Sequence, residues 1–380
     1  MLPRDNPSPR IPSRDHSACF TVHVSVYKSF SLALLAVSLM FVSIGNAQTP
    51  SFSSVNVAIG RVTGDQGLSS RSIWAITQDK QGFIWIGTNY GLDRFDGRQC
   101  VVYHAAPDST GLSDDCVWCL FSDQDGSLWI GTNSGLNRFD PLTLTFKKYL
   151  HEPSDSTSLS DNEVRCIRRD RAGILWVGTK HGFNRFESST GRWTRFFPTP
   201  EDAATPGDNV ISTILEDSRG RFWVGTGSYV MLGGGLFVFD RVSGQFSRVM
   251  YTPSNPFMSS FGWVSALAED SSNIVWISTD HFGLNSYNEI SRNFEHLSLP
   301  ENPKWFRMSG SAEKRPTRHS VKTVCEDRTG ALWIATYGSG LFRYDKRARS
   351  FTVFANDVEE SDNLSSVLIN TMFLDNAKLL

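Results

Sequence analysis

Short apolar stretches separated by glycine-containing turns run along most of the chain. The segment from Ile73 to Thr88 shows the unit, which consists of an apolar stretch, the turn sequence Asp-Lys-Gln-Gly and a second apolar stretch, Phe83–Ile86. An apolar run this short, bounded by turn residues, predicts a β-strand that is covered on both faces. The pattern therefore predicts an all-β protein made of short strands and tight turns.

The unit occurs six times, at intervals of 44 to 57 residues. Each copy carries an aspartate, a tryptophan six residues later and a threonine three residues after the tryptophan. The aspartates are Asp79, Asp123, Asp170, Asp217, Asp270 and Asp327, and the tryptophans are Trp85, Trp129, Trp176, Trp223, Trp276 and Trp333. A Gly-apolar pair such as Gly91-Leu92 follows, and each copy ends in an aromatic stretch such as Phe146–Tyr149.

Each unit is expected to form four antiparallel strands. Aspartate at the first position and glycine at the fourth favour a type I turn, in which the carboxylate caps its own backbone. Asn273 replaces the glycine in the fifth unit and tolerates the same backbone region. Four-stranded units of about 40–50 residues, each covered by its neighbours, are typical of β-propeller blades. We expect the six tryptophans to pack between blades, as structural residues.

Counting the units predicts an incomplete ring. The six complete blades lie near residues 68–104, 112–150, 159–197, 207–250, 260–297 and 319–355, and a partial unit covers 364–376. Residues 55–59 alternate like a strand and are expected to form the outermost strand of a seventh blade. The predicted fold class is therefore an all-β propeller with six complete blades plus the first strand of a seventh. We expect an open ring in a truncated chain; a closed six-bladed ring is the alternative.

Residues 1–47 are expected to lie outside the propeller, which spans residues 50–376. Residues 1–28 are polar and irregular, and the apolar run from Ser29 to Ile44 follows. A lysine before this run and small residues after it describe a secretory signal peptide, and the run is short for a membrane span. We expect a cleaved signal peptide and a periplasmic, extracytoplasmic location, with an uncleaved anchor as the alternative.

Charge and cysteine content remove several classes of function. The chain has 37 Lys+Arg and 39 Asp+Glu, which gives a formal net charge of −2. A nucleic-acid-binding protein is expected to have an excess of basic residues, and this chain has no such excess. Cys116 and Cys119 have CxxC spacing, but residues i and i+3 of a strand point to opposite faces. No second CxxC is present to complete a metal site. The cysteines are expected to be small core residues, and no metal or cofactor is expected.

The segments Leu112–Leu136 and Leu159–Phe183 carry the motif most clearly, and it resembles the two-component regulator propeller repeat. The resemblance covers about residues 50–376. It implies the periplasmic sensor propeller of a Bacteroidetes-type hybrid two-component histidine kinase, anchored in the inner membrane, with oligosaccharides as the usual ligands. It also implies the downstream sensor and kinase modules of the parent protein as partners; a homodimer is a further option. The chain has no kinase motifs of its own, so we expect no kinase domain and no enzyme activity here.

A ligand is expected on the face that carries the turns between second and third strands and the connections between blades. Two long insertions fall there, Thr226–Gly235 and Leu297–Ser320, and long loops on a rigid scaffold often carry function. The candidate ligand-binding residues are Tyr90, Lys180, His181, Tyr229, His281, Trp305, Arg307 and Tyr337. Aromatic and charged side chains suit a sugar, and they suit a protein partner equally well.

The sequence thus predicts an extracytoplasmic ligand-sensing propeller that binds an oligosaccharide and signals to a downstream transmembrane histidine kinase. One alternative is a secreted propeller lyase or hydrolase acting on polysaccharide. His181 and His281, two blades apart, are its candidates for the general acid and base. A stand-alone protein-binding scaffold is the other alternative.

Overall fold

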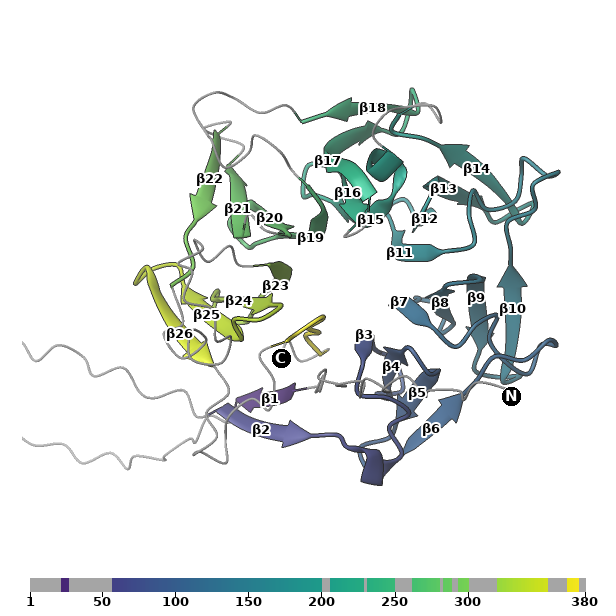
Figure 1. Cartoon of the computed structure of the whole chain (residues 1–380), viewed down its shortest axis with the longest axis horizontal. Helices are drawn as coiled ribbons and strands as arrows, with labels where there is room; N and C mark the ends of the chain where they lie inside the picture. Colours follow the sequence, from purple (N-terminus) through teal and green to yellow (C-terminus); the bar gives the residue numbers. More distant parts are fainter. Residues whose placement is uncertain are drawn as a thin grey trace, which may run out of the picture.

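The computed structural model describes residues 22–26, 57–199, 206–228, 231–249, 262–280, 283–288, 293–300, 320–354 and 368–375. Six four-stranded antiparallel sheets within these residues are arranged around a common axis as the blades of a β-propeller (Figure 1). In every blade the strands pair in chain order, and the first strand lies nearest the axis. The prediction of an all-β propeller with six four-stranded blades is confirmed.

The strands of the first three blades are β3 (Ile73–Gln78), β4 (Ile84–Thr88), β5 (Leu92–Phe95) and β6 (Cys100–Tyr103); β7 (Val117–Ser122), β8 (Leu128–Thr132), β9 (Gly135–Asp140) and β10 (Thr145–Tyr149); and β11 (Val164–Arg169), β12 (Leu175–Thr179), β13 (Gly182–Glu187) and β14 (Arg192–Phe196). Those of the last three are β15 (Ile211–Glu216), β16 (Phe222–Ser228), β17 (Met231–Asp240) and β18 (Gln245–Arg248); β19 (Val264–Glu269), β20 (Val275–Thr279), β21 (Gly283–Asn288) and β22 (Asn293–Leu297); and β23 (Val321–Glu326), β24 (Leu332–Thr336), β25 (Leu341–Asp345) and β26 (Ser350–Phe354). Two short 3-10 helices, η1 (Gly64–Gln66) and η2 (Pro206–Asn209), precede blades one and four.

The aspartate of each repeat holds both the turn and the tryptophan. In blade one, Oδ1 of Asp79 accepts the backbone N–H groups of Gln81 and Phe83, each at 3.0 Å. Its Oδ2 accepts the indole N–H of Trp85 at 2.7 Å. The same indole-to-carboxylate hydrogen bond occurs in all six blades, at 2.7–3.0 Å. Asn273 has a φ of 60° at the turn position where the other blades have glycine.

The tryptophans of the first five blades pack against the following blade. The ring of Trp85 lies 5.3 Å from that of Phe139 in blade two, and Trp176 lies 5.3 Å from Phe222 in blade four. The second strands come close enough to the next blade to require a small residue. A methyl group on Gly131 would lie 2.6 Å from Cγ1 of Val164 in blade three. The apolar core is therefore a series of interfaces between blades.

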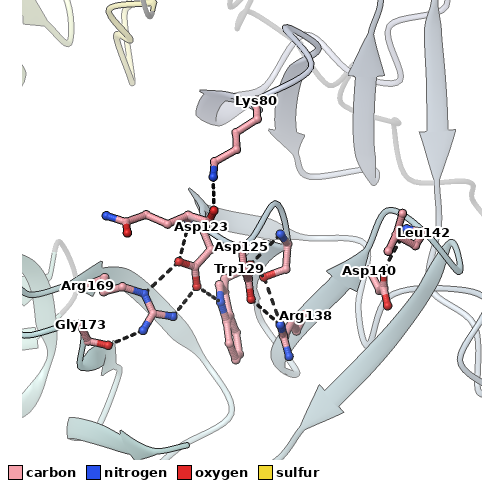
Figure 2. Close-up of polar contacts among 11 residues, drawn as sticks. Lys80, Asp123, Asp125, Trp129, Arg138, Asp140, Leu142, Arg169 and Gly173 are labelled. Carbon is pink, nitrogen blue, oxygen red and sulfur yellow. Dashed lines mark hydrogen bonds and ion pairs between the residues drawn. The ribbon is translucent and has the colours of Figure 1, made fainter.

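Charged side chains join neighbouring blades on the face that carries the Asp-x-x-Gly turns. Figure 2 shows one such contact, in which Nε of Arg169 in blade three donates a hydrogen bond to Asp123 of blade two at 2.9 Å. Nη2 of the same arginine also pairs with this carboxylate. In blade six, Lys346 donates to Asp270 of blade five at 2.8 Å and also contacts Glu326. These contacts add polar connections to the apolar interfaces.

Residues 368–375 lie between the last blade and the first, near the axis (Figure 1). Leu368 forms an isolated antiparallel bridge with Tyr337 of blade six. The Asn370 Nδ2 group donates to the carbonyl of Ile73 in blade one at 3.1 Å. The segment therefore touches both neighbours of the expected seventh position. Residues 369–375 are not assigned to a strand, so the seventh-blade strand stays a prediction.

A two-stranded sheet corrects two expectations for the N-terminal part. Strand β2 (Val57–Arg61) pairs antiparallel with β1 (Val22–Val26), not with a strand of a blade. Strand β1 lies in the segment 1–28, which is predicted above to be irregular. Its sequence, Val-His-Val-Ser-Val, alternates apolar and polar residues as a strand does, but the prolines and polar residues before it obscure the pattern. Residues 29–44, the core of the expected signal peptide, lie outside the described residues.

A serine ties the connection before each of the first three blades to that blade's third strand. In blade three, Oδ1 of Asn184 accepts the N–H of Ser160 at 2.9 Å, and its Nδ2 donates to the Val177 carbonyl at 3.2 Å. Blade one has Asp93 at this position. Its Oδ2 accepts the Ser69 hydroxyl at 2.7 Å, but an ionised carboxylate cannot donate to the main chain. Burial raises the pKa of Asp93, and hydrogen bonds from Ser69 only partly oppose this.

Replacing Asp93 by asparagine is expected to stabilise the protein at neutral pH by about 1 kcal/mol, because it removes a buried charge and supplies the missing donor. Since the pKa is raised in the folded state, the native aspartate destabilises the fold as pH rises above its ordinary value of 3.8. The gain in the free energy of unfolding should therefore shrink as pH falls toward that value. Urea unfolding of Asp93→Asn and the parent at pH 4 and pH 7 measures it; an equal gain at both pH values would contradict this explanation.

Candidate functional site

Every inner strand contains a β-bulge at its second residue. The pairing of β3 with β4 shifts register between Ile73 and Ala75, and the other five blades shift at the equivalent place. Bulges re-aim side chains and are common beside functional sites. The six bulge residues are Trp74, Trp118, Arg165, Ser212, Ser265 and Lys322. They differ in chemistry, although the strands around them repeat.

The bulge residues lie at the same end of the ring as the turns between second and third strands, since Ile73 at the start of β3 pairs with Thr88 at the end of β4. In five blades the residue after the repeat threonine donates its N–H to the carbonyl of the residue before the inner strand. These pairs are Asn133–Cys116, Lys180–Glu163, Gly227–Val210, Asp280–Trp263 and Tyr337–Ser320. Turns, connections and bulges thus form one surface, which we call the loop face.

Blades one to three bring aromatic and charged residues together on this face. The Trp74 and Trp118 rings lie 4.9 Å apart at 49°, and the Arg165 guanidinium lies 4.1 Å from the Trp118 ring. Glu163 pairs with Arg165 and, at 2.9 Å, with Nζ of Lys180. We call these five residues the tryptophan–arginine cluster. They come from three blades, so only the assembled ring forms it.

Two donors of the cluster lack hydrogen-bond partners among the described residues. They are the indole N–H of Trp74 and the Nε–H of Arg165, and both nitrogen atoms are buried. The indole of Trp118, by contrast, donates to Oδ1 of Asn133 at 2.8 Å. Burial also lowers the pKa of the Arg165 guanidinium. A buried donor without an acceptor costs about 1–3 kcal/mol, so the cluster is incompletely satisfied as it stands.

A second group of aromatic and charged residues lies in blades five and six. Nζ of Lys322 lies 4.1 Å from the Trp263 ring, 5.4 Å from the Tyr337 ring and 3.6 Å from Asp280. Burial lowers the pKa of Lys322, and Asp280 opposes that shift. This lysine is therefore held within an aromatic pair and beside a carboxylate.

The remaining bulge residues have small side chains that connect neighbouring blades. The Ser212 hydroxyl donates to the carbonyl of Val264, and that of Ser265 donates to the carbonyl of Val321. Asn370 makes the corresponding contact with Ile73. Blades four and five therefore offer little chemistry at the bulge, and the aromatic and charged groups lie on the other blades.

Four of the predicted site residues fall in the described part of the chain, in three different blades. Tyr90 is 63% exposed in the turn after β4, and Tyr337 is 49% exposed after β24. Lys180 joins the cluster through Glu163. Its neighbour His181 lies 5.3 Å from the ring of Phe197. Lys180 and His181, which are adjacent in the sequence, therefore lie in blade three, whereas Tyr90 and Tyr337 lie in blades one and six.

The other four predicted site residues, Tyr229, His281, Trp305 and Arg307, lie outside the described residues. The expected pairing of His181 with His281 stays a prediction for the same reason. The expectation of a long loop in blade four is partly wrong. Strands β16 and β17 continue into this segment, and Ser228 pairs with Met231. The residues added there extend a β-hairpin.

The sequence prediction missed Trp74, Trp118, Glu163, Arg165 and Lys322. A usable signal was present. The residue after the first apolar residue of each inner strand is Trp, Trp, Arg, Ser, Ser and Lys in the six units, while the positions around it repeat. Variation at one position of an internal repeat marks a side chain that the architecture does not dictate. The register shift that exposes this position cannot be read from the pattern.

The described residues contain no group of three or more His, Cys, Asp or Glu side chains placed to hold a metal ion. Their five cysteines are free thiols, and burial raises the pKa of Cys166 to about 12. In the same part of the chain, no helix has the length and apolar character needed to cross a membrane.

The family model for the two-component regulator propeller matches residues 67–90, 111–134, 158–181 and 205–228. Each match, in blades one to four, begins in the connection before an inner strand and ends at the end of the second strand or just after it. Blades five and six depart from the repeat at its glycine, with Ser278 and Ala335 in that place. A search of curated protein sequences finds no significant match.

Solved structures with the same fold include extracellular domains of two hybrid two-component systems from B. thetaiotaomicron. That of BT3049 is 23% identical, with a TM-score of 0.67 over 84% of this chain and 40% of its own. That of BT4673 is 20% identical, with a TM-score of 0.61 over 81% of this chain and 36% of its own. A virginiamycin B lyase from Staphylococcus aureus, in complex with quinupristin, is 13% identical with a TM-score of 0.53, over 74% of this chain and 83% of its own. This chain thus spans less than half the length of the two extracellular domains.

Proposed function

This chain is built from two-component regulator propeller repeats, and we propose that it is the extracytoplasmic ligand-sensing propeller of a two-component system, with an oligosaccharide as its ligand. The similar structures from hybrid two-component systems are extracellular domains, which supports a sensing role. Binding would occur on the loop face and be passed to a downstream transmembrane histidine kinase. Export by the N-terminal apolar segment belongs to the same proposal.

The composition of the loop face is the observation that carries this proposal. Six equivalent bulge positions hold two tryptophans, an arginine and a lysine together with two serines. The structural tryptophans, by contrast, are the same in every blade. Aromatic rings beside charged and amide groups suit the apolar faces and hydroxyl groups of sugars.

Substitutions on the loop face test the proposal. We expect Trp118→Ala and Tyr337→Ala to weaken oligosaccharide binding to the full chain by about tenfold or more, because each removes an aromatic contact at the binding surface. Isothermal titration calorimetry with a panel of neutral and acidic oligosaccharides measures the affinity. Thermal melts establish that each variant is folded.

Leu142→Ala is the matched control. Leu142 is 93% exposed in the turn between β9 and β10, at the opposite end of the blades. This variant should bind as the parent does. Affinity that is unchanged in both aromatic variants would rule out the loop face, and a panel without any binding oligosaccharide would rule out this ligand class.

A further inference from the structure

The two aromatic groups of the loop face form a continuous arc. Blades five and six contribute Trp263, Lys322 and Tyr337, and blades one to three contribute the tryptophan–arginine cluster. Residues 368–370 lie between the two groups, because Leu368 bridges to Tyr337 and Asn370 bonds to blade one. An arc that crosses several blades suits an elongated ligand with several units.

At one end of the arc, some N–H donors lack a hydrogen-bond acceptor among the described residues. Glu163 is the carboxylate partner of both cations, and its two oxygens contact Arg165 and Lys180 separately, so one negative charge is shared between two positive charges. Burial raises the pKa of the nearby Asp161, and the positive charges of Lys180 and Arg165 oppose this shift. The indole N–H of Trp74 and the Nε–H of Arg165 have no acceptor among the described residues.

We propose that the arc binds an acidic oligosaccharide, with a sugar carboxylate taken up by Arg165 and the indole N–H of Trp74. The carboxylate supplies acceptor oxygens for both donors, and hydrogen bonds to an ionised acceptor are roughly twice as strong as neutral ones. Trp74 and Arg165 are only partly buried residues, so binding would require a small rotation that turns each buried N–H toward the ligand. This inference rests on the proposed function and adds the charge of the ligand to it.

The test uses the full chain and matched pairs of ligands. The probes are uronic acid trisaccharides, such as trigalacturonate, each beside its carboxyl-reduced neutral counterpart. Calorimetry should show the acidic member of a pair binding at least tenfold more tightly. Added salt should weaken binding of the acidic member only, because salt screens the ionic contact.

Two variants locate the carboxylate. Arg165→Gln should weaken binding of the acidic member about tenfold or more, and the loss for the neutral member should be much smaller. Trp74→Phe keeps an aromatic ring and removes only the N–H, so a smaller loss of roughly threefold to fivefold is expected. The control is Arg138→Gln, which removes an arginine paired with Asp125 on the opposite face (Figure 2) and should bind as the parent does.

The outcomes separate this inference from the function it rests on. Equal affinity for the acidic and neutral members, with loss of both in Trp118→Ala, would overturn the inference and support oligosaccharide sensing. An affinity for the acidic member that does not change in Arg165→Gln would also overturn it. If neither series binds, both the inference and the proposed ligand class are wrong.

Discussion

Replacing Trp176 by alanine is expected to lower the free energy of unfolding by about 3–5 kcal/mol, because truncating a fully buried aromatic leaves a cavity that the core cannot refill. Trp176 is 1% exposed and lies in the interface between blades three and four. Its ring stacks on Phe183 at 4.9 Å and contacts Phe222 and Phe239 of the next blade at 5.3 and 5.5 Å. Denaturant unfolding followed by far-ultraviolet circular dichroism measures the loss.

Trp333→Ala is the matched comparison. Trp333 occupies the same repeat position and makes the same hydrogen bond to its turn aspartate, Asp327. Its outward neighbours are Ile369, Met372 and Leu374, which are only partly buried. We therefore expect a loss of about 2 kcal/mol. Equal losses in the two variants would show that packing onto a complete following blade adds nothing.

Replacing Asp270 by alanine is expected to cost about 3 kcal/mol, because it leaves several buried or half-buried donors without an acceptor. The Asp270 side chain is fully buried. It accepts hydrogen bonds from the indole N–H of Trp276 at 2.9 Å and from the ammonium group of Lys346 at 2.8 Å. Lys346 belongs to the next blade. Asp270 also accepts the Ile274 N–H at 3.0 Å within its own turn.

The loss of stability in Asp270→Ala should become smaller as pH falls. Burial disfavours the charged form of Asp270, but the hydrogen bonds from Lys346, Trp276 and the Ile274 amide outweigh it, and the pKa is lowered. A lowered pKa means that the stabilisation is complete above the ordinary value of 3.8 and is lost as pH falls below it. The difference in the free energy of unfolding between the parent and Asp270→Ala should therefore be constant near neutral pH and become smaller in acid. Unfolding at pH 3 and pH 7 checks this.

Asp240→Ala controls for the loss of an aspartate in a turn. Asp240 is exposed, and among the described residues its carboxylate accepts local hydrogen bonds, from the N–H of Val242 and the hydroxyl of Ser243, each at 2.8 Å. Its removal should destabilise the protein much less than Asp270→Ala. Similar losses would indicate that the turn, and not the connection to Lys346, determines the effect.

The blades could be predicted from the sequence because their determinants are local and repeated. Asp, Gly, Trp and Thr at fixed spacing specify two strands and a turn, and six copies leave little doubt about the architecture. Even the exception at Asn273 could be anticipated, since asparagine tolerates the left-handed backbone that the structure shows there.

The candidate site could not be predicted in the same way, because its members meet only across blades. Trp74, Trp118 and Arg165 lie in three inner strands, and the register shift beside each of them decides where its side chain points. A strand pattern carries no mark of such a shift. The insertion in blade four was misjudged for a related reason, since its glycines suggested a loop and pairing across β16 and β17 extends the hairpin instead.

The direction in which the tryptophans pack has a consequence for how the protein is made. Trp85 packs on blade two, Trp129 on blade three and Trp223 on blade five, so each indole is covered by the blade that follows it in the chain. During synthesis from the N-terminus, each of the first five blades would therefore present an uncovered indole, against which the next blade could fold. The blades would then assemble in order from the N-terminus, and at each stage an exposed apolar surface would lie on the blade formed last.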